Sequence, residues 1–444
     1  MYLWENRLMK NIAPYIHEQF PDQDIEFIIG NNDTDLYSYF KEHGELPDIM
    51  TVRRFSGTDA QDLQPYLMDF ASYDVVSKYY SYAVEYYKDT DNEIQWLPIC
   101  AIPQTIIANK TLFDQYGIKV PENYEEYVQV CQQFYDKGIK PYSMDLAEDW
   151  SNQEIIQAAA IGEFTSLDGI DWRNKAETSA GEIKFDDVLW KRIFSETSQF
   201  LKDSHFSKED INVNVNTGTQ MFVEGKSAMF HGQPTDMQKL QDQMDAELIR
   251  IPYFSQTSDS SFVYMFPSLN IAFNKELEKN QEKLDTALDV LDCMISEQGQ
   301  KLIADGSGVI SFNTDVPSMM QNVPGLEEEI KDTSIYIRYS AQKSFDASLE
   351  AVHGLLSGKM DEMQAYNAFR SAMNSKDSKE KSTVNFENEY SILLTDTTKS
   401  ILKKINPKCA IEQIGDTTLS SAWIAAMSNG QQPSAPEDYI EVEK

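Results

Sequence analysis

Short β-rich runs alternate with amphipathic helical stripes over most of this chain, and the alternation restricts its fold more than any other feature. Near the amino terminus, DIEFIIG (24–30) has the pattern of a strand, DTDLYSYFKEH (33–43) of a helix and DIMTV (48–52) of another strand. Much later, NQEKLDTALDVLDCMIS (280–296) carries apolar residues on one helical face. Alternating strands and helices are typical of α/β folds. We therefore predict an α/β protein.

The segment EIQWLPICAIPQTIIAN (93–109) predicts two extended pieces broken at Pro98 and Pro103. Proline cannot donate a hydrogen bond to a sheet and disfavours a helix. Such a segment suits a crossing between two lobes. The stretch after it predicts a helix that Asn123 caps, with Glu126 three residues further on. Cys131 lies on the apolar face of that helix, so its simplest place is in the core.

A polar run, MNSKDSKEKSTVN (373–385), interrupts the alternation of strands and helices and indicates a linker or an exposed loop. Beyond it, ENEYSILLTDTTKSILKKI (387–405) is helical in pattern, and the last residues are acidic. The sequence therefore predicts a helical carboxyl-terminal extension.

The charge of the chain excludes several classes of partner. The sequence has 38 Lys and Arg against 72 Asp and Glu, a formal net charge of -34. An acidic field of this size repels nucleic acid and anionic lipid headgroups. No run approaches the ~18 apolar residues of a membrane span, and the amino terminus lacks the pattern of an export signal. The hydrophobic content of 41% fits a soluble globular protein, and the four separated cysteines do not decide its compartment.

Signatures of the common enzyme classes are missing from the sequence. It contains no GxxxxGK[ST], GxGxxG, HExxH or GxSxG motif. Its five histidines do not stand at the spacing of metal ligands. We therefore predict no catalytic residue, no metal and no cofactor.

Polar and aromatic residues gather instead at predicted junctions between strands and loops. In open α/β sheets, ligands bind outside the carboxyl ends of the strands. A ring of such residues therefore predicts a binding cleft, although each aromatic residue also suits ordinary packing. The candidate ligand-binding residues are Trp4, Glu5, Asn6, Arg53, Phe55, Gln104, Asp149, Trp150, His231, Gln233, Tyr264 and Phe266.

The segment from Leu97 to Asp145 closely resembles the lobe-crossing region of extracellular solute-binding proteins of bacterial ABC importers. The likeness is to their large sugar-binding, maltose-binding-protein-like family. Further matches are LPDIM (46–50), FVEGKSAMFHG (222–232), ALDVLDCMISEQGQKLI (287–303) and GVISFN (308–313). The family pattern NK-LF---GI-VP-(T/N)(W/Y)-E is matched here by Asn109, Lys110, Leu112, Phe113, Gly117, Ile118, Val120, Pro121, Asn123, Tyr124 and Glu125.

This resemblance implies a two-lobed, periplasmic-binding-protein-like fold with a hinge and a cleft between the lobes. By likeness, one lobe takes 1–108 and 268–313 and the other takes 109–267 and 314–375. Residues 376–444 are left as a linker and carboxyl-terminal extension. The candidate residues above lie on loops that face the ligand in relatives. The sequence departs from the family where relatives often carry Trp, since it has Gln233 and Pro234 after the FHG turn.

The resemblance also implies a function: capture of an extracellular carbohydrate, an oligosaccharide above all, and its delivery to the permease subunits of an ABC transporter. Family members in Gram-positive bacteria are commonly lipoproteins, and we expect an extracellular, lipid-anchored monomer. The same fold could instead bind a polyamine, a phosphoester or a peptide; an anion would favour paired arginines, such as Arg53 with Arg54. A third hypothesis is a glycan-acting enzyme, which requires two carboxylates across the cleft.

Overall fold

The structure is a computed structural model, and it describes residues 1–4, 6–30, 36–52, 63–89, 91–178, 183–305, 308–318, 335–339 and 342–375, with 418–419 and 440–441. The chain divides into two units, Met1–Asn374 and Ser375–Lys444. In the second unit, β12 (Thr418–Leu419) pairs antiparallel with β13 (Ile440–Glu441). The helix that we predict at 387–405 and most of the predicted linker lie outside the described residues.

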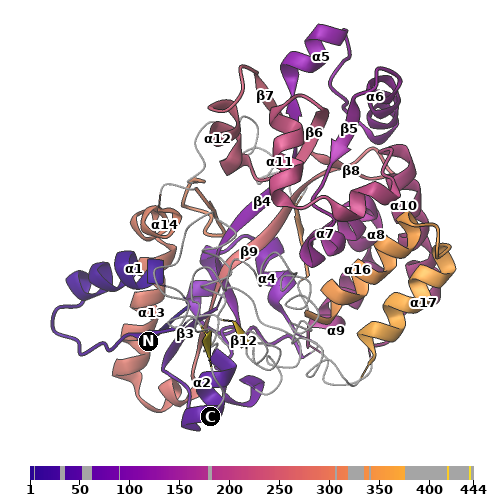
Figure 1. Cartoon of the computed structure of the whole chain (residues 1–444). Helices are drawn as coiled ribbons and strands as arrows, with labels where there is room; N and C mark the ends of the chain where they lie inside the picture. Colours follow the sequence, from indigo (N-terminus) through magenta and orange to yellow (C-terminus); the bar gives the residue numbers. More distant parts are fainter. Residues whose placement is uncertain are drawn as a thin grey trace, which may run out of the picture. The chain divides into compact units, whose positions relative to one another are not determined.

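The first unit is a mixed α/β structure, as the sequence predicts (Figure 1). Its sheet has the strand order β2-β1-β3-β9-β4-β6-β5. In addition, β7 and β10 pair with β4, and β8 and β11 pair with β9. The strand predicted at 24–30 is shorter than expected and covers only Ile28–Ile29. The strands are β1 (Tyr2–Leu3), β2 (Ile28–Ile29), β3 (Ile49–Val52), β4 (Leu97–Asn109), β5 (Lys140–Ser143), β6 (Ser227–Gly232), β7 (Leu248–Ile251), β8 (Tyr253–Phe254), β9 (Ser261–Phe273), β10 (Ile310–Ser311) and β11 (Ile335–Ile337).

Helices pack around two main hydrophobic cores in this unit. The first core joins buried residues between Met1 and Ala101 to others between Val263 and Ile337. Its helices are α1 (Asn6–Gln19), α4 (Ser81–Tyr87), α13 (Gln281–Ile295) and α14 (Glu297–Ala304), and α2 (Leu36–His43) packs on a smaller neighbouring cluster.

The second core is built from buried residues between Ile106 and Met373. Its helices include α5 (Lys110–Tyr116), α6 (Tyr124–Asp136), α7 (Asp149–Ala159), α8 (Ile161–Phe164), α9 (Leu167–Thr178), α10 (Asp187–Asp203), α16 (Gln342–Leu356) and α17 (Glu362–Met373). Another small cluster packs beside β6, near α11 (Val215–Val223) and α12 (Met237–Gln241). The lobe boundaries inferred from the family resemblance stay a prediction.

Two long strands, β4 and β9, run side by side from one core to the other (Figure 1). The first half of β4 pairs with β9, and its last residues pair with β6 and β7. The prediction of two pieces broken at Pro98 and Pro103 was therefore wrong, because β4 continues through both prolines. Residues of β4 before Pro103 pair with β10, and residues after it pair with β6. On that side no strand among the described residues lies opposite Pro103 itself, so its missing N–H is tolerated. Near Pro98 the pairing register shifts.

The helix that we predict after the crossing is confirmed as α6. The Asn123 side chain accepts a hydrogen bond of 2.9 Å from the backbone N–H of Glu126. The side chain of Glu126 in turn accepts one from the N–H of Glu122 rather than from that of Asn123. Cys131 is fully buried in the second core, as expected from its place on the apolar face.

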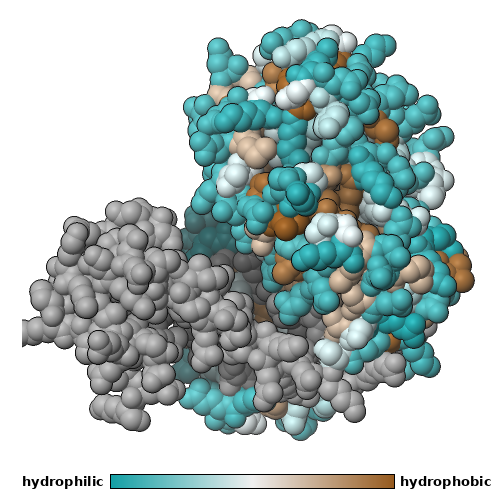
Figure 2. All heavy atoms as spheres, turned by 45° about the vertical axis from the view of Figure 1, so that its right-hand side comes forward, coloured by the Kyte–Doolittle hydropathy of each residue, from teal (hydrophilic) through white to brown (hydrophobic). Residues whose placement is uncertain are grey.

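Hydrophilic side chains cover most of the described surface that is visible in Figure 2, in keeping with the acidic composition. Hydrophobic side chains gather there in smaller patches. No helix among the described residues is long and apolar enough to cross a membrane.

Candidate functional site

The carboxyl ends of two strands meet at one edge of the sheet in the second core. Strands β5 and β6 run parallel, with Tyr142 opposite Met229. Strand β4 is antiparallel to β6, and Thr105 lies opposite Gly232, so Gln104 lies at the same edge. This edge is where an open α/β sheet binds its ligands.

A cavity of about 370 Å³ opens at this edge. Four of the residues predicted from the sequence line it together, although they come from different parts of the chain. Gln104 comes from β4, Trp150 from the first turn of α7, and His231 from β6. Gln233 follows β6 directly and also lines the cavity. The volume of the cavity lies within the range of about 300–1,000 Å³ that is typical of small-molecule sites.

Trp150 offers an aromatic ring to this cavity without being a core residue. Its side chain is half-buried, and its ring centroid lies 6.4 Å from that of His231 with the two planes at 38°. The Asp149 carboxylate accepts a hydrogen bond of 2.6 Å from the backbone N–H of Trp150. Asp149 therefore holds the start of α7 and is not among the residues that line the cavity.

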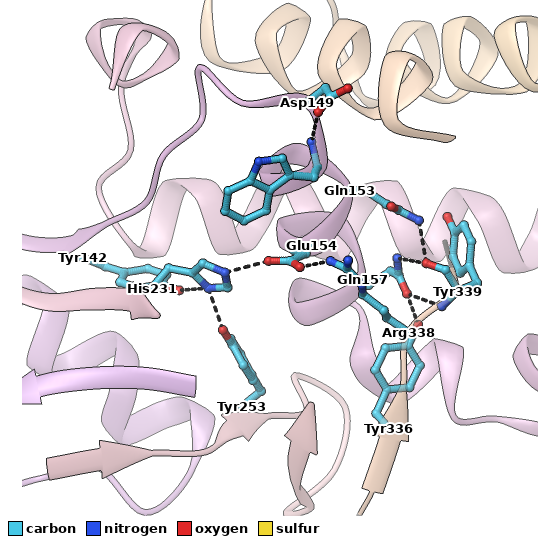
Figure 3. A network of polar contacts seen from close by, with 11 residues as sticks. Tyr142, Asp149, Gln153, Glu154, Gln157, His231, Tyr253, Tyr336, Arg338 and Tyr339 are labelled. Carbon is cyan, nitrogen blue, oxygen red and sulfur yellow. Dashed lines mark hydrogen bonds and ion pairs between the residues drawn. The ribbon is translucent and has the colours of Figure 1, made fainter. Parts of the chain in front are cut away.

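A buried polar network lies behind the cavity wall, and Figure 3 shows Glu154 between His231 and Arg338. Glu154 belongs to α7, and Oε2 of its carboxylate lies 2.7 Å from Nε2 of His231. Its other oxygen forms an ion pair with the guanidinium of Arg338. All three side chains are almost entirely buried. Since buried charges are costly unless they are paired, each of the three depends on the others.

The contacts of His231 define its tautomer when the imidazole is neutral. A carboxylate can only accept, so Nε2 carries the proton that it donates to Glu154. Nδ1 then accepts a hydrogen bond of 2.9 Å from the hydroxyl of Tyr253. Burial lowers the pKa of His231, and the nearby Asp145 carboxylate only partly opposes this effect. We therefore expect a neutral imidazole with a fixed ring orientation at the cavity wall.

The other end of the network reaches the strands that connect the two cores. The backbone N–H of Arg338 donates to the carbonyl of Met265 in β9 over 2.9 Å. Its carbonyl accepts a hydrogen bond of 2.7 Å from the hydroxyl of Tyr86 in α4. The Gln157 side chain donates to the carbonyl of Tyr339 and accepts from its N–H (Figure 3). A continuous set of contacts thus joins the cavity wall to α4 of the first core.

Two more predicted residues lie at an edge of the first core. Strands β1 and β3 are parallel, with Tyr2 opposite Met50. Trp4 follows β1, is half-buried, and donates its backbone N–H to Oγ1 of Thr51 over 2.9 Å. Asn6 is exposed at the start of α1. Glu5, Arg53 and Phe55 lie outside the described residues, and all five assignments stay predictions.

Tyr264 and Phe266 are not among the residues that line the cavity, although Tyr264 lies opposite the lining residue Gln104 in the pairing of β9 with β4. Tyr264 is buried in the second core, with its ring against those of Tyr253 and Tyr336. The guanidinium of Arg338 stacks over the ring of Phe266, 4.5 Å from its centroid. These aromatic residues support the network from behind, and their predicted contact with a ligand stays a prediction.

Sequence reasoning missed two groups at this site. Asp145 lines the cavity and lies two residues after the end of β5. The rule that selected the other candidates, a polar residue near the end of a strand, therefore also applies to Asp145. Glu154 and Arg338 carry no such signal, because charged side chains in helical or isolated positions are normally exposed. Among the described residues, no group of three or more His, Cys, Asp or Glu side chains could hold a metal ion.

Two cores joined by crossing strands, with a cavity at the strand ends, define the class of two-lobed solute-binding proteins. The chain belongs to the family of bacterial extracellular solute-binding proteins, whose profile matches residues 41–332. This result confirms the family resemblance seen in the sequence.

Comparison with known proteins places the chain beside sugar-binding members of this class. It is 24% identical over 202 residues to the multiple sugar-binding protein of Streptococcus mutans; the match covers 41% of this chain and 47%, about half, of that relative. A family 1 extracellular solute-binding protein from Bifidobacterium longum subsp. infantis has a similar fold, with a TM-score of 0.70, 13% identity and coverage of 84% of this chain and 97% of that one. The apo form of RafE from Streptococcus pneumoniae gives a TM-score of 0.63 at 15% identity, over 84% and 96% of the two chains.

Proposed function

We propose that this protein is the substrate-binding component of an ABC importer that captures an extracellular oligosaccharide and delivers it to the permease subunits. We further propose that it works as a monomer held to the membrane by a lipid anchor, as relatives in Gram-positive bacteria commonly are. We expect it to bind its ligand without any chemical conversion.

The observation that carries this proposal is the composition of the cavity at the edge of the second core. An aromatic ring, Trp150, stands beside the side-chain amides of Gln104 and Gln233 and the fixed imidazole of His231. Sugars have apolar C–H faces that pack on aromatic rings and hydroxyl groups that exchange hydrogen bonds with amides and carboxylates. The cavity offers both kinds of surface.

Known ligands of similar structures support an oligosaccharide in particular. RafE has been solved in complex with raffinose, with a TM-score of 0.58 to this chain. A Bacillus licheniformis sugar transporter was solved with stachyose, at a TM-score of 0.53, and a chitin oligosaccharide binding protein gives 0.56. Their identities to this chain are 14–16%, and their ligands set the panel of candidate saccharides.

The proposal is tested by calorimetric titration against raffinose, stachyose, triacetylchitotriose and xylotriose, with spermidine, glycerol phosphate and a tripeptide as non-sugar solutes. We expect saturable binding of at least one saccharide and none of the non-sugar solutes. Mass spectrometry of the bound saccharide after prolonged incubation should return it unchanged. Binding of a non-sugar solute alone, or hydrolysis that survives purification to homogeneity, would contradict the proposal.

We also expect ligand binding to bring the two cores closer together. Strands β4 and β9 carry the chain from one core to the other, and such connections act as hinges in two-lobed proteins. A ligand that contacts both lobes favours the closed form by the difference in its affinity for the two states. Small-angle scattering should give a smaller radius of gyration with the tightest-binding saccharide at saturation. An unchanged profile at saturation would instead indicate a rigid cleft.

A further inference from the structure

Asp145 is a nearly buried carboxylate at the wall of the candidate ligand cavity. It lies two residues after the end of β5, and only 3% of its surface is exposed. It lines the same cavity as Trp150 and His231. Within the part of the chain that the structure describes, no other residue donates a hydrogen bond to its carboxylate, and no lysine or arginine forms an ion pair with it.

Such a group is costly for the folded protein. Removing a carboxylate from water without giving it donors disfavours its ionised form. Burial accordingly raises the pKa of Asp145. A hydrogen bond from its own backbone N–H opposes this shift only in part, and His231 opposes it only when its imidazole is protonated. Residues that reduce stability in this way are typical of binding sites, where the missing partners come from a ligand.

The other charges around Asp145 do not neutralise it. Asp236 and Lys239, which also line the cavity, are 3.7 Å apart and offset each other. Behind His231, the charge of Glu154 is paired with Arg338. Among the described residues, Asp145 also interacts electrostatically with the carboxyl of Glu148 and the hydroxyls of Tyr142 and Tyr253, none of which is positive. The carboxylate of Asp145 is thus in excess at this wall.

We propose that Asp145 restricts the cavity to saccharides without negative charge, because its carboxylate accepts hydrogen bonds from ligand hydroxyl or amino groups and repels ligand carboxylates. This inference rests on the proposed function and specifies its substrate class. Neutral and amino-bearing oligosaccharides fit the site, whereas uronic acids and sulfated sugars do not.

The test uses one matched pair of probes. The neutral member is the saccharide that binds most tightly among raffinose, stachyose, triacetylchitotriose and xylotriose. The acidic member is a derivative of it that carries a carboxylate on a ring substituent. It is made by oxidising a primary hydroxyl or, for xylotriose, is the glucuronic acid-substituted form. The natural protein should bind the neutral member at least about tenfold more tightly than the acidic one. In Asp145→Asn, binding of the neutral member should fall about tenfold, since a hydrogen bond to a charged acceptor is roughly twice as strong as a neutral one. Binding of the acidic member should improve.

Thermal melts of the unliganded variant separate a ligand-binding role from a structural one. The raised pKa means that the Asp145 side chain contributes stability below its unfolded pKa, and that this contribution is lost as the pH rises through the folded pKa. The asparagine side chain does not ionise, so the variant does not lose this stability as the pH rises. Asp145→Asn should therefore melt at or above the temperature of the natural protein at neutral pH. The control is Asp289→Asn, which removes an exposed charge from α13 and should change neither binding nor discrimination.

Each outcome has one meaning. If no neutral saccharide binds, the proposed function fails and this inference fails with it. If a neutral saccharide binds but its acidic partner binds equally well, the function stands and the inference is overturned. The inference is also overturned if Asp145→Asn melts lower and weakens both probes alike, because a structural role then accounts for the residue.

Discussion

Replacing Trp150 by alanine is expected to weaken saccharide binding by about 2 kcal/mol, on the order of thirtyfold, and to leave the fold intact. The reason is the position of the ring, which lines the cavity and is half-buried. An aromatic anchor of this kind contributes most where it covers the apolar face of a sugar. Because the ring is not enclosed by the core, its removal leaves no closed void.

The measurement pairs calorimetric titration with denaturant melts on the same variant. A matched control is Trp172→Ala, since Trp172 is buried in the second core against Trp190, with ring centroids 4.5 Å apart. That change should cost about 3–5 kcal/mol of folding stability through the cavity it leaves. If Trp150→Ala folds well and binds as tightly as the natural protein, Trp150 is not a ligand contact.

Replacing Glu154 by glutamine is expected to lower the free energy of unfolding by about 3–5 kcal/mol. The carboxylate accepts from His231 and pairs with Arg338, and an amide of the same shape cannot accept from both. One buried donor then faces the amide NH₂, and the charge of Arg338 loses its partner. Urea denaturation of the unliganded protein measures the loss.

Two further variants show whether the loss comes from the broken pair. Combining Glu154→Leu with Arg338→Met removes both charges and should recover much of the stability, since apolar replacements of a buried pair are often neutral or stabilising. Glu297→Gln breaks the exposed pair with Lys301 in α14 and should cost less than about 1 kcal/mol. A loss for Glu154→Gln no larger than that of Glu297→Gln would show that water reaches the network.

Local patterns were sufficient to predict the elements whose side chains follow a clear period. The helix capped by Asn123 and the burial of Cys131 were predicted correctly, because both depend on residues within one or two turns. The prolines in β4 misled the prediction, since whether a missing N–H is tolerated depends on which strand lies opposite. That pairing is a long-range property.

The candidate site could also be predicted from the sequence only in part. The sequence by itself determined the α/β class and the family resemblance, and it selected Gln104, Trp150, His231 and Gln233, which line one cavity in the structure. The rule about strand ends accounts for His231 and Gln233 at the end of β6. Gln104 reaches the same edge from the middle of β4, because that strand runs antiparallel to β6 and continues through Pro103. The network behind them could not be predicted, because Glu154 belongs to α7 and Arg338 follows β11, and these segments are far apart in sequence.

Tertiary structure alone decided which charged residues are buried. Most of α7 is polar in sequence, with Ser151, Asn152, Gln153 and Gln157 beside Glu154, and such a composition is typical of an exposed helix. In the structure these side chains are buried. Tyr336 in β11 and Tyr339 after it supply partners to Gln153 and Gln157, and the carbonyls of Leu146 and Glu148 accept from Asn152. A buried polar side chain is stable only when its partners arrive from elsewhere in the chain, and no local pattern in the sequence states where those partners are.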